Sequence, residues 1–149
     1  APAGIRRVHL IDSTPIGANV RSTVATYSGV MDELRRAFAQ APSAKERSLH
    51  AGDFSYNTGS LRCPVCDGTG TISLDVQFLP DVEITCPSCR GGRFGEAAWQ
   101  IRRSFARAKK GTEPKSFALP ELMEMTVDEA LKYIISMGVV APPAHPKKP

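Results

Sequence analysis

The sequence predicts an α+β fold, in which a small helical domain carries an inserted β-hairpin. Apolar residues recur at helical spacing in segments 28–39 and 126–138, and they alternate with polar residues between 72 and 84. The four cysteines flank the alternating segment as two pairs. A chain of 149 residues with 42% hydrophobic content is long enough for one domain with a sub-module.

The N-terminal part is expected to contain one strand and one helix. Val8–Ile11 is a short apolar run that predicts a strand, and a loop containing Pro and Gly follows it. Ser28 is suited to cap a helix that runs to Ala39. Three apolar residues would share one face of this helix: Val30, Leu34 and Phe38. Segment 41–48 is then expected to be a loop or a short turn.

The segment between the cysteine pairs predicts a hairpin. Residues 72–78 alternate between apolar and polar, as in a half-buried strand. Pro80 and Asp81 indicate a turn, and Val82 and Ile84 continue the alternation on a return strand. An isolated two-stranded hairpin is marginally stable in water, so we expect something to close its open end.

The cysteines lie at that open end with the spacing of a metal site. Cys63-Pro-Val-Cys66 and Cys86-Pro-Ser-Cys89 are separated by 19 residues. Zn²⁺ takes four tetrahedral ligands in structural sites, and two C-x₂-C pairs at about this spacing supply them. The alternative is a pair of redox or disulfide motifs. It is weaker because no βαβ pattern surrounds either pair and no secretory leader is present, which favours a reducing compartment.

The C-terminal part predicts two more helices. Segment 96–108 reads as a basic helix with apolar positions at Trp99, Ile101 and Phe105, and segment 109–116 as a charged loop. Thr126-Val127-Asp128-Glu129 is a capping box, which predicts a helix beginning there and ending near Gly138. Residues 139–149 read as a flexible tail.

The charge of the chain is unevenly distributed. The net charge is +4, and from Arg90 to Lys115 there are eight basic residues against two acidic ones. Between the cysteine pairs there are four acidic residues and no basic one. The basic stretch is either a solvated helix face or a surface that contacts phosphates. The hairpin, being acidic, is the poorer candidate for phosphate contact.

Several function classes are not supported by the sequence. No Walker A loop and no grouping of nucleophile, base and oxyanion donors are found, so the chain is not expected to be an enzyme on its own. No apolar run is long enough to span a membrane, and a cytoplasmic location is expected. Because the chain begins with Ala1 rather than Met, we expect it to be either a processed chain or a piece cut from a longer protein.

Several motifs, in a fixed order, resemble the UvrA family, the damage-recognition ATPases of bacterial nucleotide excision repair. They are Ile11-Asp12-Ser13-Thr14-Pro15-Ile16-Gly17, Ala25-Thr26-Tyr27-Ser28-Gly29, Phe54-Ser55-Tyr56-Asn57, the cysteine pairs, Phe78-Leu79-Pro80-Asp81-Val82, and Met125-Thr126-Val127-Asp128-Glu129-Ala130. The resemblance runs from about Val8 to Met137. It implies the C-terminal half of a tandem ABC ATPase, from the Q-loop through a helical signature-type domain with an inserted zinc module.

The resemblance also implies a division of the chain. Residues 1–62 would hold the Q-loop region and the first helical part of the signature-type domain, and residues 63–92 the zinc-binding hairpin module. Residues 93–138 would complete the helical domain, and 139–149 form the tail. Walker A, Walker B and the LSGGE signature do not occur in the chain, so ATP and Mg²⁺ would bind only to the parent protein.

The resemblance implies particular partners and site residues. The partners are damaged double-stranded DNA, a second parent subunit in a homodimer, and a UvrB-type protein bound through regions absent here. The expected zinc ligands are Cys63, Cys66, Cys86 and Cys89, and the expected DNA contacts are Arg21, Arg62, Arg90 and Arg93. Ser13 aligns with the Q-loop glutamine of the family. That departure favours a divergent paralogue, such as those linked to resistance to DNA-intercalating drugs.

Two alternatives stay open from the residues alone. Cys63-x-x-Cys66-x-Gly68-x-Gly70 is also the repeat of the DnaJ-type zinc region, which binds unfolded polypeptide. That region has four such repeats, whereas this chain has two. The module could also be a purely structural insert without a ligand of its own.

Overall fold

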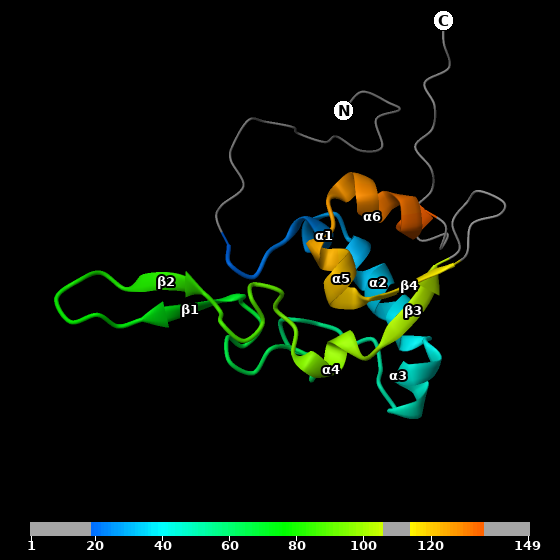
Figure 1. Cartoon of the computed structure of the whole chain (residues 1–149), viewed down its shortest axis with the longest axis horizontal. Coiled ribbons are helices and arrows are strands. Elements are labelled where there is room, and N and C mark those ends of the chain that lie inside the picture. The colour runs from blue at the N-terminus through cyan, green and yellow to red at the C-terminus, as the bar shows by residue number, and fades with distance from the viewer. Residues whose placement is uncertain (1–18, 106–113, 136–149) are drawn as a thin grey trace, which may run out of the picture.

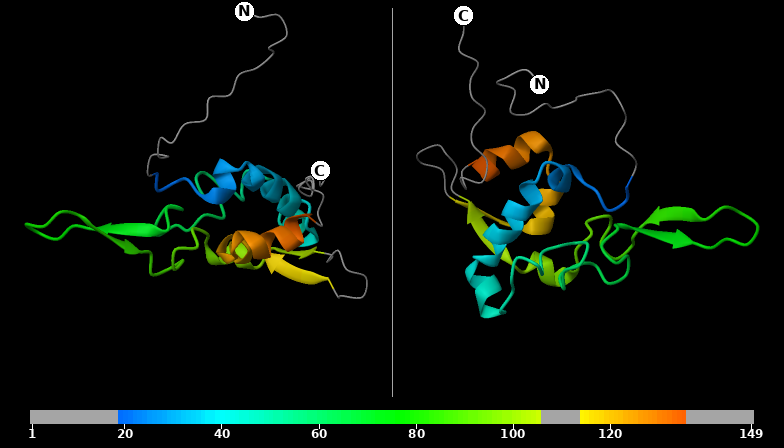
Figure 2. Two further views of the ribbon diagram at one scale, coloured as in Figure 1. Left: turned by 90° about the horizontal axis from the view of Figure 1, so that it is seen from above. Right: turned by 180° about the vertical axis from the view of Figure 1, so that it is seen from behind.

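The computed structural model describes residues 19–105 and 114–135. A helical body carries one β-hairpin that projects far from it, and a second two-stranded sheet lies within the body (Figure 1). Figure 2 shows the projecting hairpin from two further directions. The elements are α1 Val24–Tyr27, α2 Val30–Ala39, α3 Pro42–Glu46, β1 Thr71–Leu74, β2 Val82–Thr85, α4 Glu96–Trp99, β3 Arg102–Phe105, β4 Lys115–Ala118, α5 Leu119–Glu124 and α6 Val127–Ile134. The predicted α+β class is confirmed. The predicted strand Val8–Ile11, Ser13, Gly138 and the tail lie outside the described residues.

The first helical turn differs from the prediction. Ser28 does not cap α2, because its backbone N–H bonds to the carbonyl of Val24 and it ends the short helix α1 instead. Thr23 caps α1 with a capping box to Thr26. Gly29 then takes a left-handed conformation, with φ of 78°, and starts α2 without a side-chain cap. Only a residue that tolerates positive φ can turn the chain so sharply between two helices.

The long helix α2 packs one face into the core. Met31, Leu34 and Phe38 are buried on this face, and Val30 packs partly against it, in agreement with the predicted spacing. After α2, residues 42–46 form the short helix α3 rather than only a loop or turn. Pro42 stands at its first position, where a missing N–H costs nothing and the fixed φ suits a helix.

The predicted hairpin forms, but it is shorter and more exposed than expected. β1 and β2 pair antiparallel from Thr71↔Thr85 to Leu74↔Val82. The turn lies before Pro80, where the N–H of Leu79 bonds to the carbonyl of Val76 and Phe78 has φ of 70°. The expectation of a half-buried strand reaching residue 78 is wrong. Of the strand residues only Thr71 and Ile72 are partly buried, because no second layer from residues 19–105 or 114–135 covers either face of the sheet.

The predicted basic helix over 96–108 is also wrong within its described part. The helix α4 ends at Trp99, and the chain continues as β3, which pairs with β4 in the register Arg102↔Ala118 to Phe105↔Lys115. The described end of the predicted charged loop is thus a strand. Ile101 and Phe105 are both buried and lie four residues apart. This spacing places two side chains on the same face of a helix, and also on the same face of a strand. Their burial is decided by the distant partner strand.

The core of the body lies between α2, β3, β4 and the C-terminal helices. Phe105 packs against Phe38 and Tyr133, at ring-centroid distances of 6.1 and 6.5 Å. The helix α5, which the sequence did not predict, buries Leu119 and Leu122 here. The capping box of α6 is confirmed: Thr126 accepts from the Glu129 N–H, and the Glu129 carboxylate accepts from the Thr126 N–H. Within the described part of the chain no helix is long and apolar enough to cross a membrane.

Candidate metal centre

The four cysteines come together at the base of the hairpin. Their Sγ atoms all lie within 4.8 Å of one another. Cys63 and Cys86 Sγ are 4.0 Å apart, and Cys66 and Cys89 Sγ are 3.6 Å apart. A tetrahedral ion with metal–sulfur bonds of 2.3 Å requires sulfurs about 3.8 Å apart. A disulfide requires about 2.05 Å. The donor set therefore fits a tetrahedral, thiophilic metal ion.

The centre is largely buried and is separate from the main core. Cys63 and Cys86 are fully buried, Cys66 nearly so, and Cys89 is half-buried. Ile72 on β1 packs against this cluster, which shares no member with the core of the body. Four sulfur donors leave no open coordination position, so such a centre stabilises structure rather than activating water.

Each cysteine pair is followed by a turn that uses left-handed backbone. Asp67 and Gly68 after the first pair have φ of 53° and 79°, and Arg90 and Gly91 after the second have 52° and 85°. The turns aim backbone donors at the sulfurs, since the Gly70 N–H bonds to Cys66 Sγ at 3.3 Å. We call these two turns, residues 66–70 and 89–93, the knuckles.

The thiols do not share one protonation behaviour. Burial opposes ionisation of Cys63, but hydrogen bonds from the backbone of Cys66 and Val65 outweigh it and lower the pKa of this thiol to about 7. Burial raises the pKa of the Cys89 thiol to about 12, and hydrogen bonds with the Cys66 and Cys86 sulfurs add to that effect. A cation is therefore needed to hold all four as thiolates near neutral pH.

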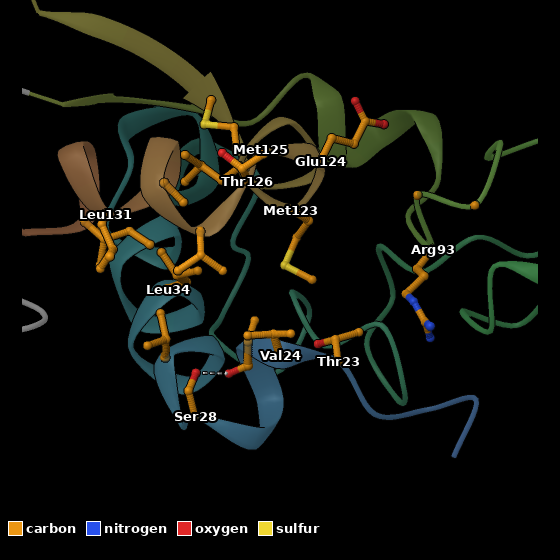
Figure 3. Close-up of a pocket in the computed structure, with 18 of the residues that line it drawn as sticks. Thr23, Val24, Ser28, Leu34, Arg93, Met123, Glu124, Met125, Thr126 and Leu131 are labelled. Atoms are coloured by element: carbon orange, nitrogen blue, oxygen red, sulfur yellow. Dashed lines mark hydrogen bonds between the residues drawn. The ribbon is translucent and has the colours of Figure 1, made fainter. Parts of the chain in front are cut away.

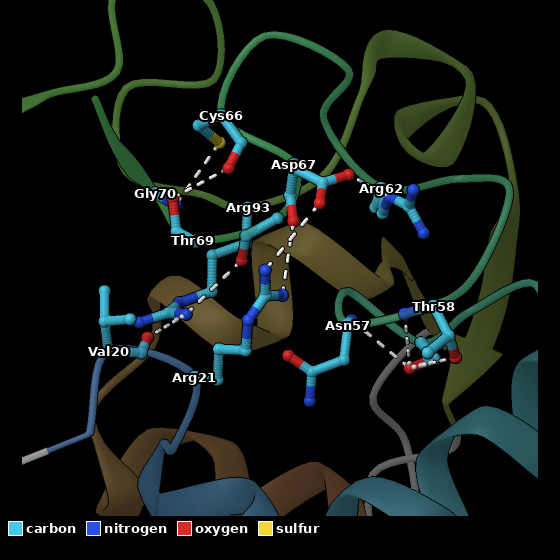
Figure 4. A network of polar contacts seen from close by, with 12 residues as sticks. Val20, Arg21, Asn57, Thr58, Arg62, Cys66, Asp67, Thr69, Gly70 and Arg93 are labelled. Carbon is cyan, nitrogen blue, oxygen red and sulfur yellow. Dashed lines mark hydrogen bonds and ion pairs between the residues drawn. The ribbon is translucent and has the colours of Figure 1, made fainter. Parts of the chain in front are cut away.

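Two of the arginines predicted to contact DNA meet at the first knuckle (Figure 4). Arg62 Nε lies 2.6 Å from Asp67 Oδ1, and Arg21 Nη2 lies 3.7 Å from Asp67 Oδ2. Arg21 Nη1 also donates to the Asp67 carbonyl oxygen at 3.5 Å. Both guanidinium groups are thus held by one exposed carboxylate.

The third arginine, Arg93, connects the second knuckle to the rest of the body. Its Nη1 donates to the carbonyl oxygens of Val20 at 2.7 Å and Gly68 at 3.4 Å. Its guanidinium lies over the Tyr56 ring, 5.1 Å from the centroid. Arg93 thereby fixes the segment before α1 against both knuckles.

The fourth arginine, Arg90, is exposed and makes no ion pair among the described residues. The structure therefore brings all four predicted arginines to the knuckles, three of them in intramolecular contacts. Sequence reasoning missed Asp67 and Tyr56, which organise these contacts. The adjacency of Asp67 to Cys66 was the available signal for Asp67, but its arginine partners could not be read from the sequence.

Arg90 and Arg93 also border an apolar cavity of about 580 Å³ (Figure 3). The cavity lies between α1 and α2 on one side and α5 and α6 on the other, and its apolar lining includes Val24, Leu34, Met123 and Leu131. The sequence did not predict this cavity, because the helices on its two sides are about 90 residues apart in the chain.

The chain was compared with known proteins. No model of a known protein family matches it. It is 39% identical over 129 residues to UvrABC system protein A of Methanothermobacter thermautotrophicus, and 36% identical over 131 residues to that of Thermus thermophilus. These matches cover 87% and 88% of this chain but 12% and 13% of the relatives, so the chain spans about an eighth of their length. A solved structure, UvrA2 from Deinococcus radiodurans, matches with a TM-score of 0.68 and 33% identity, over 87% of this chain and 14% of that one.

Proposed function

Since the chain belongs to the UvrA family, we propose that it is the zinc-bearing, DNA-facing segment of a UvrA-like ABC ATPase that recognises damaged DNA in nucleotide excision repair. One observation carries the proposal. The similarity extends over nearly nine tenths of the chain and includes the segment in which the four cysteines converge. The chain supplies structure and DNA contacts, and no catalytic group of its own.

Zinc is the proposed metal, bound by Cys63, Cys66, Cys86 and Cys89. The sulfur spacing, the burial and the all-thiolate donor set suit Zn²⁺ in a structural role. When bound, the ion supplies the positive charge that keeps four thiolates together. The ion thereby holds together the two chain segments at the base of the hairpin, which has little apolar packing of its own.

Double-stranded DNA is the proposed partner, and the knuckles rather than the hairpin provide the phosphate contacts. Arg21, Arg62, Arg90 and Arg93 gather at the knuckles, whereas the exposed hairpin carries Asp75, Asp81 and Glu83. Contacts with ATP and Mg²⁺, with a second parent subunit and with a UvrB-type protein would lie in parts of the parent outside this chain. The parent is proposed to act in the cytoplasm.

Binding to duplex DNA tests the proposal. We expect the zinc-loaded chain to bind a fluorescent duplex, with or without a lesion, in an anisotropy titration at low salt. Four phosphate contacts predict that affinity falls about 150-fold between 50 and 200 mM salt, because each contact releases bound counterions. Arg90→Gln should weaken binding and make the salt dependence shallower by about one contact.

A matched control separates local contact from overall charge. Lys45→Gln makes the same charge change on α3 and should alter binding less than Arg90→Gln. No binding at 20 mM salt, together with suppressed aggregation of an unfolded client protein, would instead favour the DnaJ-type function. A UvrA-like paralogue of drug resistance is the alternative within the family. A preference for intercalator-bound over lesion-bearing duplex would favour it.

A further inference from the structure

Asp67 joins two arginines that come from distant parts of the chain. Its Oδ1 lies 2.6 Å from Arg62 Nε, and its Oδ2 lies 3.7 Å from Arg21 Nη2. The Asp67 side chain is 59% exposed, so the cluster opens to solvent rather than into the core. Figure 4 shows both arginines beside this one carboxylate, with Arg62 contacting it through Nε.

A guanidinium group recognises a carboxylate and a phosphodiester in the same way. Both anions present oxygen acceptors that match the planar fork of arginine, and both form short charge-assisted hydrogen bonds with it. Exposed ion pairs of this kind are weak and can be exchanged. The position of the Asp67 carboxylate is therefore a position that a DNA phosphate could take.

The backbone holds Asp67 in place independently of the arginines. Asp67 has φ of 53°, and Gly68 beside it is packed so tightly that an added Cβ would lie 1.7 Å from the Tyr56 carbonyl oxygen. The knuckle thus fixes the backbone from which the exposed carboxylate projects. Asparagine also tolerates this left-handed conformation, so the charge can be removed without changing the fold.

The surroundings of the cluster are polar. A surface hollow of about 740 Å³ adjoins it, lined by Arg62 and Asp67, by the hydroxyl-bearing Thr58 and Ser60, and by a second carboxylate, that of Asp53. Ser60 already donates its hydroxyl to Asp53, and this bond is the main cause of the lowered pKa of Asp53. The Thr58 hydroxyl likewise donates to Ser55 Oγ at 3.4 Å, so Arg21 and Arg62 are the donors that remain for an incoming phosphate.

Asp67 differs from the other acidic residues between the cysteine pairs. Among the described residues Asp75, Asp81 and Glu83 form no ion pair. Asp67 forms two, one with Arg21 and one with Arg62. The four residues have the same charge, so only position distinguishes Asp67. This difference allows the contribution of position to be separated from that of net charge.

We propose that Arg21 and Arg62 form a phosphodiester-binding subsite, and that the Asp67 carboxylate occupies it in the free protein as a competing intramolecular anion. Binding of DNA exchanges carboxylate for phosphate, with no covalent step. This inference rests on the proposed function, because it specifies how the DNA-facing surface is kept closed to weak anions. An incoming anion must therefore displace the Asp67 carboxylate before it can bind to Arg21 and Arg62.

The variant Asp67→Asn tests the subsite, with Asp75→Asn as the control that makes the same charge change on the hairpin. Duplex affinity of the zinc-loaded chain is measured by anisotropy at several salt concentrations. In parallel, inorganic tripolyphosphate is titrated by calorimetry as a probe that needs no duplex. We expect Asp67→Asn to bind both probes about three- to tenfold more tightly than the wild type, and Asp75→Asn to exceed the wild type by less than about twofold.

The double variant Asp67→Asn/Arg62→Gln should lose the gain, since one guanidinium of the subsite is gone. Equal metal content and melting temperature of all variants would exclude a folding effect. Suppose that the wild type binds DNA and that Asp67→Asn and Asp75→Asn bind the duplex with equal affinity. That result would overturn the subsite and leave the proposed function intact. Tighter tripolyphosphate binding by Asp67→Asn without any DNA binding would support the subsite and overturn the proposed function. Failure of both probes with every variant would overturn both.

Discussion

Tyr56 connects the metal centre to the N-terminal part of the described chain through one side chain. Its hydroxyl donates to the Arg21 carbonyl at 3.0 Å and lies 3.3 Å from the Thr26 hydroxyl. Its ring packs edge-on against Phe94 and lies beneath the Arg93 guanidinium. The four cysteines could be predicted from their spacing alone. Tyr56 could not, because its importance comes from contacts with residues about 30 to 40 positions away.

An added methyl group at Gly68 should strongly lower the free energy of unfolding. In Gly68→Ala the added Cβ would lie 1.7 Å from the Tyr56 carbonyl oxygen, at a φ of 79° that alanine disfavours. We expect a loss of at least about 2 kcal/mol in the free energy of unfolding, from strain and overpacking combined. Urea denaturation of the zinc-loaded protein measures it.

The control is Gly52→Ala, because Gly52 has no atom within 4 Å of an added Cβ. Its stability should stay within about 0.5 kcal/mol of the wild type. Equal stabilities of the two variants would show that the first knuckle does not pack against Tyr56 as described.

At the scale of elements, the capping box of α6 was a reliable local signal, whereas the predicted Ser28 cap and the features that depend on distant contacts were not predicted correctly. The capping box of α6 depends only on interactions between Thr126 and Glu129, which are close in the sequence, and it forms as predicted. The stretch 102–105 has no local signal that separates a helix from a strand, and its pairing with β4 decides the outcome. For the same reason the hairpin was predicted correctly, but its burial was not, since burial depends on what packs against it.

The capping box of α6 predicts a pH-dependent stability. Hydrogen bonds from the Thr126 hydroxyl and backbone N–H hold the pKa of Glu129 below its ordinary value of 4.5. A carboxylate with a lowered pKa stabilises the fold above its ordinary pKa, and this stabilisation is lost as the pH falls through the lowered value. We therefore expect Glu129→Ala to lower the melting temperature at pH 7, and this effect to become smaller as the pH falls below 4.5.

The control for the same helix turn is Asp128→Ala, which removes a carboxylate that forms no capping bond. At pH 7, Asp128→Ala should lower the melting temperature less than Glu129→Ala does. Thr126→Ala should cost about 1 kcal/mol, because it removes the N-cap acceptor. An effect of Glu129→Ala that is the same at pH 3 and pH 7 would contradict a contribution from the ionised box.

At the scale of the whole molecule, the described residues form two buried clusters. One joins the helices and the β3–β4 sheet, and the other consists of the cysteines with Ile72. Hydrogen bonds between the backbones of Cys63 and Arg93, and between Gly95 and Leu61, connect the segments at their junction. The proposed boundaries after residues 62 and 92 stay a prediction, although the separate clusters agree with them.

Removal of the metal should distinguish these two clusters. Zinc binding contributes on the order of 10–16 kcal/mol to small metal-dependent folds. We expect a chelator to abolish amide-exchange protection in residues 71–85, while α2 and α6 keep most of theirs. Hydrogen exchange followed by mass spectrometry measures both regions in one sample. Restored protection of the hairpin after added zinc is the control, and simultaneous loss of protection everywhere would show that the chain is one cooperative unit.

The exposed hairpin has a consequence for the behaviour of this chain in concentrated solution. Within the described residues the β1–β2 sheet has two strands, so each strand leaves one edge without a ladder partner. Apolar side chains on it are exposed, and Phe78 at its tip is fully so. Such an edge invites pairing between molecules and aggregation. Asp75, Asp81 and Glu83 place like charges on this same surface, and their mutual repulsion opposes the pairing of two hairpins.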